Sequence, residues 1–358
     1  MYDVFLELVR LGLGHDLVVP NDSKTVNWKA IKTLADTQGL TAVVLDGIDK
    51  YPPDFAVTLP IDLKLEWIGG VVKGEQMYAL QHEVAKDMGN LFHNNGIRTY
   101  VLKGDVIAEC YPKPNHRVSV DFDCYLLPEN GWFDAWRLGN DLIKGKNFPV
   151  YTDFYKNSTF DLPGLIVENH RYLVPFRGNE RLMALEKLLE TMIGKDNRED
   201  RFDGEWLYRP PVLVTALFLI EHAYSHFLHE GLTLRMVLDW VLFSEKHKSE
   251  IDWSTFDALV EEFGFRMFYD SFSRLGTYLM GDSEETEKLT KRDKKMLGDI
   301  WAPLDVHDTV RGWKGKSSLA GNTWRARWKY RYFTELDWMK ALWIQVKGFL
   351  FEKDPILS

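Results

Sequence analysis

Residues 118–127 read VSVDFDCYLL, an alternation of apolar and polar side chains. Successive side chains of a β-strand point to opposite faces of the sheet, so the apolar residues of this stretch share one face. Asp121 and Asp123 then lie side by side on the other face, together with Ser119 and Tyr125. Two neighbouring carboxylates repel each other unless a cation lies between them. Since divalent metals prefer oxygen ligands of this kind, the stretch predicts a strand that carries a metal site.

The composition is that of a globular protein. The 358-residue chain is 45% hydrophobic, which is enough for a buried core in one or two domains. Its formal net charge is −9, from 44 basic and 53 acidic residues, and this argues against a general nucleic-acid coat. A local basic patch, and with it a nucleic-acid partner, stays open. Cys110 and Cys124 form neither a disulfide framework nor a zinc motif, so we expect a reducing compartment.

The sequence gives no signal for secretion or for a membrane. The N-terminus, MYDVFLE, lacks the basic start of a signal peptide. The longest strongly apolar run, residues 212–220, is much shorter than the about 20 residues of a membrane-spanning helix. We therefore expect a cytoplasmic protein with no membrane partner.

Hydrophobic periodicity divides the chain into three regions. Apolar residues recur at steps of three and four from Met77 to Leu91, which predicts a long helix that ends at the turn 94–96. Beyond this helix we expect strands at 97–102, 118–127, 148–159 and 165–173, a short helix at 105–110 and a helix at 132–144. From about residue 179 the pattern is helical to the end.

The predicted fold class is therefore α+β. We expect a small mixed β-sheet core at residues 61–200, between an N-terminal helical region at 1–60 and a C-terminal helical region at 201–358.

Two neighbouring segments strengthen the metal hypothesis. Lys103 and Gly104 form a turn between a predicted strand and a predicted helix, and a helix N-terminus with a glycine suits a phosphate. The alternative is an ordinary strand-to-helix turn. Downstream, the spacing of Glu168 and His170 places both on one face of another predicted strand. The alternative for Glu168 is a charge at the edge of a strand.

Taken together, the motifs follow one order along residues 65–245. They are Leu102-Lys103-Gly104, Tyr111-Pro112, Arg117, Asp121-Phe122-Asp123, Glu168-Asn169-His170, the helical segment from Glu221 to His226, and Leu238-Asp239. This order resembles the uncharacterised nucleotidyltransferase family of the polymerase-beta-like superfamily. The chain departs from the pattern at Val120, where members usually have a small residue, and at Lys103-Gly104, where the wider superfamily has Gly-Ser.

The resemblance implies transfer of a nucleoside monophosphate from an NTP to an unknown acceptor, either a small molecule or a macromolecule. It implies two Mg²⁺ ions, or Mn²⁺ in their place, because phosphoryl chemistry needs charge neutralisation. Asp121 and Asp123 would be catalytic residues that ligate both ions. Glu168 would hold the ion that activates the acceptor and would help to take the acceptor's proton.

The resemblance also implies a nucleotide-binding set. The Gly104 backbone would meet the triphosphate at the helix start. Lys103 would either contact a phosphate or have only a structural role in the turn. Arg117 would either neutralise phosphate charge or brace the two carboxylates.

Several histidines complete the expected site. His170 would hold the metal-ligating side chains in position rather than bind the metal directly, since Mg²⁺ prefers oxygen ligands. His222 and His226, matching the family's spaced histidines, would border the active cleft, and Asp239 would brace one of them. Together with His229 they share a helix face, so a zinc site and a helix with satisfied imidazoles are both open.

The sequence leaves two further alternatives open. The segment Arg311 to Arg331 interleaves basic and aromatic residues, which fits either a grip on an anionic acceptor or a helix that packs its aromatic side chains inward. The main alternative to the enzyme is a catalytically silent nucleotide-binding or scaffold protein with the same fold. A hydrolase or kinase is disfavoured, because the sequence has no P-loop or kinase signature.

Overall fold

The computed structural model describes residues 1–16, 26–51, 58–119, 121–152, 155–176, 179–202, 205–281, 289–302 and 326–343. Within these residues, a six-stranded mixed sheet has the strand order β3-β4-β5-β2-β1-β6. Its strands are β1 (Ile97–Val101), β2 (Asp121–Pro128), β3 (Val150–Tyr151), β4 (Asn157–Leu162), β5 (Leu165–His170) and β6 (Leu207–Tyr208). The inner strand β2 pairs antiparallel with β1 and parallel with β5.

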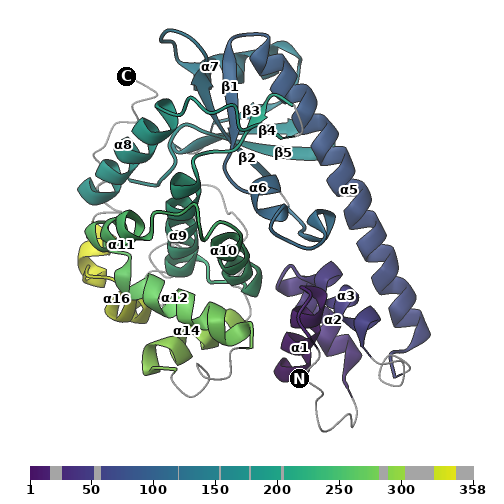
Figure 1. Ribbon diagram of the computed structural model, residues 1–358. Helices are drawn as coiled ribbons and strands as arrows, with labels where there is room; N and C mark the ends of the chain where they lie inside the picture. Colours follow the sequence, from purple (N-terminus) through teal and green to yellow (C-terminus); the bar gives the residue numbers. More distant parts are fainter. Residues whose placement is uncertain are drawn as a thin grey trace.

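Helices precede and follow the sheet in the chain. The N-terminal group is α1 (Tyr2–Gly12), α2 (Trp28–Thr37) and α3 (Thr41–Lys50). The long helix α5 (Ile61–His93) runs from this group to the sheet (Figure 1). Between the strands lie α6 (Asp105–Ala108), the 3₁₀ turn η1 (Pro114–His116) and α7 (Ala135–Gly145). The C-terminal helices are α8 (Glu180–Gly194), α9 (Val212–His229), α10 (Leu234–Lys246), α11 (Trp253–Glu262), α12 (Arg266–Leu279), α14 (Lys291–Trp301) and α16 (Arg327–Phe333).

The predicted α+β class with helical regions on both sides of a mixed sheet is confirmed. The expected strand at 148–159 is instead two strands, β3 and β4, and β6 interrupts the region expected to be helical after residue 179. The division into these three regions, with its two boundaries, stays a prediction. In the described parts of the chain, no helix combines the length and the apolar character needed to cross a bilayer.

Different helices cover the two faces of the sheet. Leu126 lies against Gly139 of α7, and the α7 side chain of Trp136 donates to the Asn169 carbonyl at 3.1 Å. On the opposite face, the ring of His170 packs edge-on against Phe218 of α9. Because side chains alternate along β2 and β5, the side chains of Asp121 and Asp123 point toward the C-terminal helices rather than toward α7.

A buried histidine connects the N-terminal helices to the strand region. In η1, His116 Nδ1 lies 2.6 Å from Asp46 Oδ2 of α3, and its Nε2 lies 3.0 Å from Glu75 Oε1 of α5. The hydrogen bond with Asp46, aided by Glu75 and opposed by burial, raises the pKa of His116. The charged imidazole thus bridges two acidic side chains from different helices.

We predict that this bridge stabilises the protein most at low pH. Because the pKa of His116 is higher in the folded state than the unfolded value of about 6.5, its contribution is present below that pH. It is lost as the pH rises through the folded pKa. His116→Gln should lower the free energy of unfolding by about 1.5–3 kcal/mol near pH 5.5 and by less near pH 9, measured by urea denaturation.

His247→Gln is the matched control, because its ring pairs with Glu250 in the neighbouring turn rather than across helices. At the lower pH, His247→Gln should lower the free energy of unfolding by less than His116→Gln does. An equal loss for His116→Gln at both pH values would contradict the charged bridge.

Candidate functional site

The parallel pairing of β2 with β5 brings the acidic residues together. In this register Asp123 lies opposite Glu168, and Tyr125 lies opposite His170. Asp121 is two residues before Asp123 on the same strand and therefore shares its face. Three carboxylates from two adjacent strands thus face the same side of the sheet.

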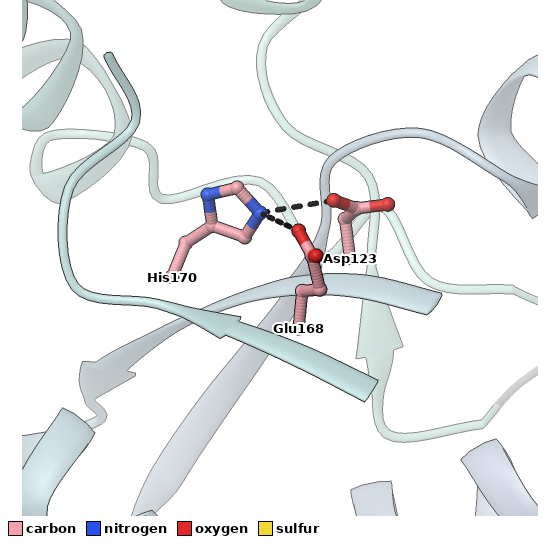
Figure 2. Close-up of side chains that lie close together, drawn as sticks. All are labelled: Asp123, Glu168 and His170. Atoms are coloured by element: carbon pink, nitrogen blue, oxygen red, sulfur yellow. Dashed lines mark hydrogen bonds and ion pairs between the residues drawn. The ribbon is translucent and has the colours of Figure 1, made fainter. Parts of the chain in front are cut away.

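Asp123, Glu168 and His170 form a compact group. One ligand atom from each residue lies within 4.8 Å of the others, an arrangement that could hold a metal ion. His170 Nε2 is 2.9 Å from Asp123 Oδ1 and 3.6 Å from Glu168 Oε2 (Figure 2). The side chain of Asp123 is only 2% exposed, whereas that of Glu168 is 35% exposed. The group is therefore buried at Asp123 and open to solvent at Glu168.

Lys103 supplies a cation to this group. Its Nζ lies 3.1 Å from Asp123 Oδ2 and 3.6 Å from Asp121 Oδ2, and the side chain is 15% exposed. Burial alone would lower the pKa of Lys103, but the attraction of Asp123, Asp121 and Glu168 raises it. Lys103 therefore stays charged beside the carboxylates.

The three carboxyl groups differ in their electrostatics. Burial and then repulsion from Asp123 raise the pKa of Asp121. Burial opposes ionisation of Asp123 as well, but Lys103 and His170 hold the pKa of Asp123 well below its usual range. The hydrogen bond with His170 lowers the pKa of Glu168. Asp123 and Glu168 are thus the firmly ionised members of the set.

His170 is the positive counterpart on the far side of Asp123. Burial lowers the pKa of His170, but its hydrogen bonds to Asp123 and Glu168 outweigh this effect and raise it. Its other ring nitrogen, Nδ1, lies 3.3 Å from the Tyr172 carbonyl. The ring is therefore fixed from both sides, which orients the two acidic side chains that it contacts.

The Lys103-Gly104 turn has a conformation that favours glycine. Gly104 has φ +71° and caps the start of α6, which is four residues long. A non-glycine residue would be strained at this angle. The Gly104 carbonyl accepts a hydrogen bond from Arg117 Nη1 at 3.3 Å. Arg117 thus contacts the backbone of the turn rather than the carboxylates of Asp121 and Asp123.

The main partner of Arg117 is Asp239 of α10. The guanidinium donates from Nε and Nη2 to the two carboxylate oxygens at 2.9 and 2.8 Å. The Tyr111 hydroxyl donates to the same carboxylate at 2.8 Å. Asp239, which the sequence suggested as a support for a histidine, is instead the buried counter-ion of Arg117. This pair connects the turn before β2 to the C-terminal helices.

His222 and His226 lie on α9, and their ring centroids are 4.4 Å apart. The His222 ring also stacks on Phe218, which contacts the His170 ring as well. Burial, followed by repulsion from Lys103, lowers the pKa of His222 well below its usual value, so the ring is neutral. His226 Nδ1 lies 2.8 Å from Glu230 Oε2. The two rings therefore border the acidic group without joining it.

Two residues near the site, Glu221 and Asn169, are only weakly indicated by the sequence. Glu221 is buried on α9, its Oε2 has no hydrogen-bond partner among the described residues, and burial raises its pKa to about 7. Asn169, between Glu168 and His170, donates to Asn140 of α7 at 2.9 Å and so fixes β5 from the opposite face. The alternation of β5 indicates that Asn169 points away from the site, but nothing local identifies its partner.

Other expected positions lie outside the described residues. Val120 is one, and residues 311–325 of the basic and aromatic segment are another. The described end of that segment is α16, where Lys329 Nζ lies 2.8 Å from Asp299 Oδ1 and Tyr330 is buried.

A mixed sheet with acidic side chains on two paired strands, a glycine turn that carries Lys103, and flanking helices forms a site that could hold a metal. The chain belongs to an uncharacterised nucleotidyltransferase family, whose model matches residues 24–281. This family implies an NTP substrate. Neither a curated protein nor a solved structure matches the chain.

We predict that the Arg117–Asp239 pair is a major determinant of stability. Asp239→Asn leaves a buried guanidinium without its counter-ion and should lower the free energy of unfolding by about 3–5 kcal/mol. The exposed pair of Arg181 and Glu335, 2.6 Å apart, provides the control. Glu335→Gln should cost about 0–1 kcal/mol in the same denaturation experiment. Similar losses in the two variants would contradict the structural role of the buried pair.

Proposed function

We propose that the protein is a magnesium-dependent nucleotidyltransferase that moves a nucleoside monophosphate from an NTP to an acceptor hydroxyl. The observation that carries this proposal is the register of β2 and β5, which sets Asp123 opposite Glu168 with Asp121 beside them. The family assignment supports the choice of an NTP as donor.

The side chains present fit a divalent cation. Asp123 Oδ2 is buried and lies 3.1 Å from Lys103 Nζ, so this oxygen already faces a cation. The donor set of Asp121, Asp123 and Glu168 is made of carboxylate oxygens, which Mg²⁺ and Mn²⁺ prefer. These three residues would hold the metal, with His170 as the group that orients Asp123 and Glu168. When bound, the metal would neutralise phosphate charge and align the reacting oxygens.

The proposed reaction is an in-line displacement at the α-phosphorus. The acceptor hydroxyl oxygen forms a bond to the α-phosphorus, and the bond from this phosphorus to the bridging oxygen of the β-phosphate breaks. Pyrophosphate leaves with that electron pair. Glu168, ionised and open to solvent, takes the hydroxyl proton and returns it to water.

Lys103 and Gly104 are the proposed contacts to the triphosphate. Lys103 is charged and reaches the same carboxylates that a metal would use, so a phosphate bound there lies within range of the ammonium group. Gly104 is itself buried, but it has no side chain that would separate a phosphate from the backbone of the turn. Arg117 holds this turn by its hydrogen bond to the Gly104 carbonyl, so its proposed contribution to nucleotide binding is to position the turn.

Removal of one metal ligand should abolish transfer. We predict that Asp123→Asn and Glu168→Gln each lower the transfer of label from α-labelled NTP to acceptors in a cell extract by at least about 100-fold, because several kcal/mol of charge stabilisation are lost. EDTA should have the same effect on the wild-type protein. Asp161→Asn, an exposed carboxylate on the neighbouring strand β4, is the matched control and should retain activity.

Nucleotide binding by the wild-type protein without any label transfer would favour the catalytically silent alternative. Transfer that survives in Asp123→Asn would contradict the proposed role of these carboxylates.

A further inference from the structure

A cavity of about 350 Å³ lies next to the candidate site. Its walls come from α2, α3, one side of α5 and the loop at residues 115–119. Figure 1 shows α5 passing along the N-terminal helices, of which α2 and α3 form the wall opposite α5. A cavity of this size suits a small molecule rather than a macromolecule.

Two glycines of α5 leave the helix backbone open to this cavity. Gly70 and Gly74 both line it and are four residues apart, so they share a helix face. A Cβ at Gly70 would meet nothing within 4 Å, and a Cβ at Gly74 would first meet Val118 at 3.9 Å. Neither position has a positive φ. Because both residues line the cavity and lack a side chain, a ligand in the cavity can approach the helix backbone closely at these two positions.

The charges in the cavity favour an anion. On α2, Asp36 is compensated, since Lys32 Nζ lies 3.0 Å from its Oδ2 and the Thr41 hydroxyl donates to its Oδ1 at 2.7 Å. On the opposite wall, Lys73 forms no ion pair with any described residue. The apolar side chains of Val71 and Met77 line the same wall. Lys32 also lies 3.2 Å from Glu66 Oε1, a residue that does not line the cavity. Among the described lining residues, Lys73 is thus the positive charge without a carboxylate partner, and it lies beside an apolar surface.

One end of the cavity adjoins the acidic strand and the glycine turn. Ser119 lines the cavity, and its hydroxyl donates to the Asp121 carbonyl at 2.8 Å. A Cβ at Gly104 would lie 3.8 Å from Ser119 Oγ. A molecule in the cavity would thus lie beside both motifs of the proposed reaction.

We propose that this cavity binds the acceptor, a small organic anion with an apolar body and a hydroxyl group. The anionic group contacts Lys73, the body lies on the open backbone of Gly70 and Gly74, and the hydroxyl faces the Ser119 end. This assignment rests on the proposed function. The hydroxyl oxygen bonds to the α-phosphorus of the NTP, pyrophosphate leaves, and Glu168 takes the proton.

The test uses 8-anilinonaphthalene-1-sulfonate, an aromatic anion that fluoresces in apolar surroundings, as the probe. Gly70→Met places a side chain in the cavity, whereas Gly69→Met makes the same change at the preceding residue, which does not line it. We expect saturable binding to the wild type, about 10-fold weaker binding to Gly70→Met and unchanged binding to Gly69→Met. Lys73→Gln should also weaken binding. Both methionine variants should have an unchanged or higher melting temperature, because methionine is the better helix former.

Binding that is equal in Gly70→Met and Gly69→Met would overturn the proposal, since the probe would then occupy an exposed apolar surface. The acceptor assignment has its own readout: the probe should inhibit label transfer in competition with the acceptor and not with the NTP. Asp123→Asn should bind the probe normally while it transfers no label, so failure of the proposed chemistry is distinguishable from failure of the pocket. Inhibition that competes with the NTP would overturn the acceptor assignment.

Discussion

The structure depends on a concentration of negative charge at the centre of its sheet. Parallel pairing of β2 with β5 brings Asp123 and Glu168 together, and Asp123 has almost no contact with solvent. A buried carboxylate is costly unless cations or hydrogen bonds compensate it. Lys103 from the turn after β1 and His170 from β5 provide this compensation. Four side chains from three strand regions are thereby held in one electrostatic unit, and the proposed chemistry uses that unit.

The surrounding elements fix the strands that carry these charges. On the α7 face, hydrogen bonds from Ser158 and Asn169 to Asn140 tie β4 and β5 to one helix. On the other face, Arg117 joins the turn before β2 to Asp239 of α10. Both contacts are buried, so they are stronger geometric constraints than exposed pairs would be. The acidic side chains therefore lie on the face of the sheet that is turned toward the C-terminal helices.

Local patterns in the sequence were sufficient for the fold class, and they identified the alternating strands that carry Asp121, Asp123, Glu168 and His170. They could not establish that β2 and β5 pair in parallel, because this depends on the path of residues 129–164. The partner of Arg117 is 122 residues away, and no local pattern identifies such a contact. The cavity beside the site is assembled from α2, α3, α5 and the loop at residues 115–119, so nothing in the local sequence distinguishes its glycines from other helix residues.

The most direct test of the central claim is to locate the metal itself. Crystals grown with Mn²⁺ and a non-hydrolysable NTP analogue should show anomalous scattering in contact with carboxylate oxygens of both Asp123 and Glu168. Lys103 Nζ should then have moved from Asp123 toward the nucleotide phosphates. Bound nucleotide with no anomalous signal at these carboxylates, or a signal confined to another part of the molecule, would rule out a metal held by Asp123 and Glu168.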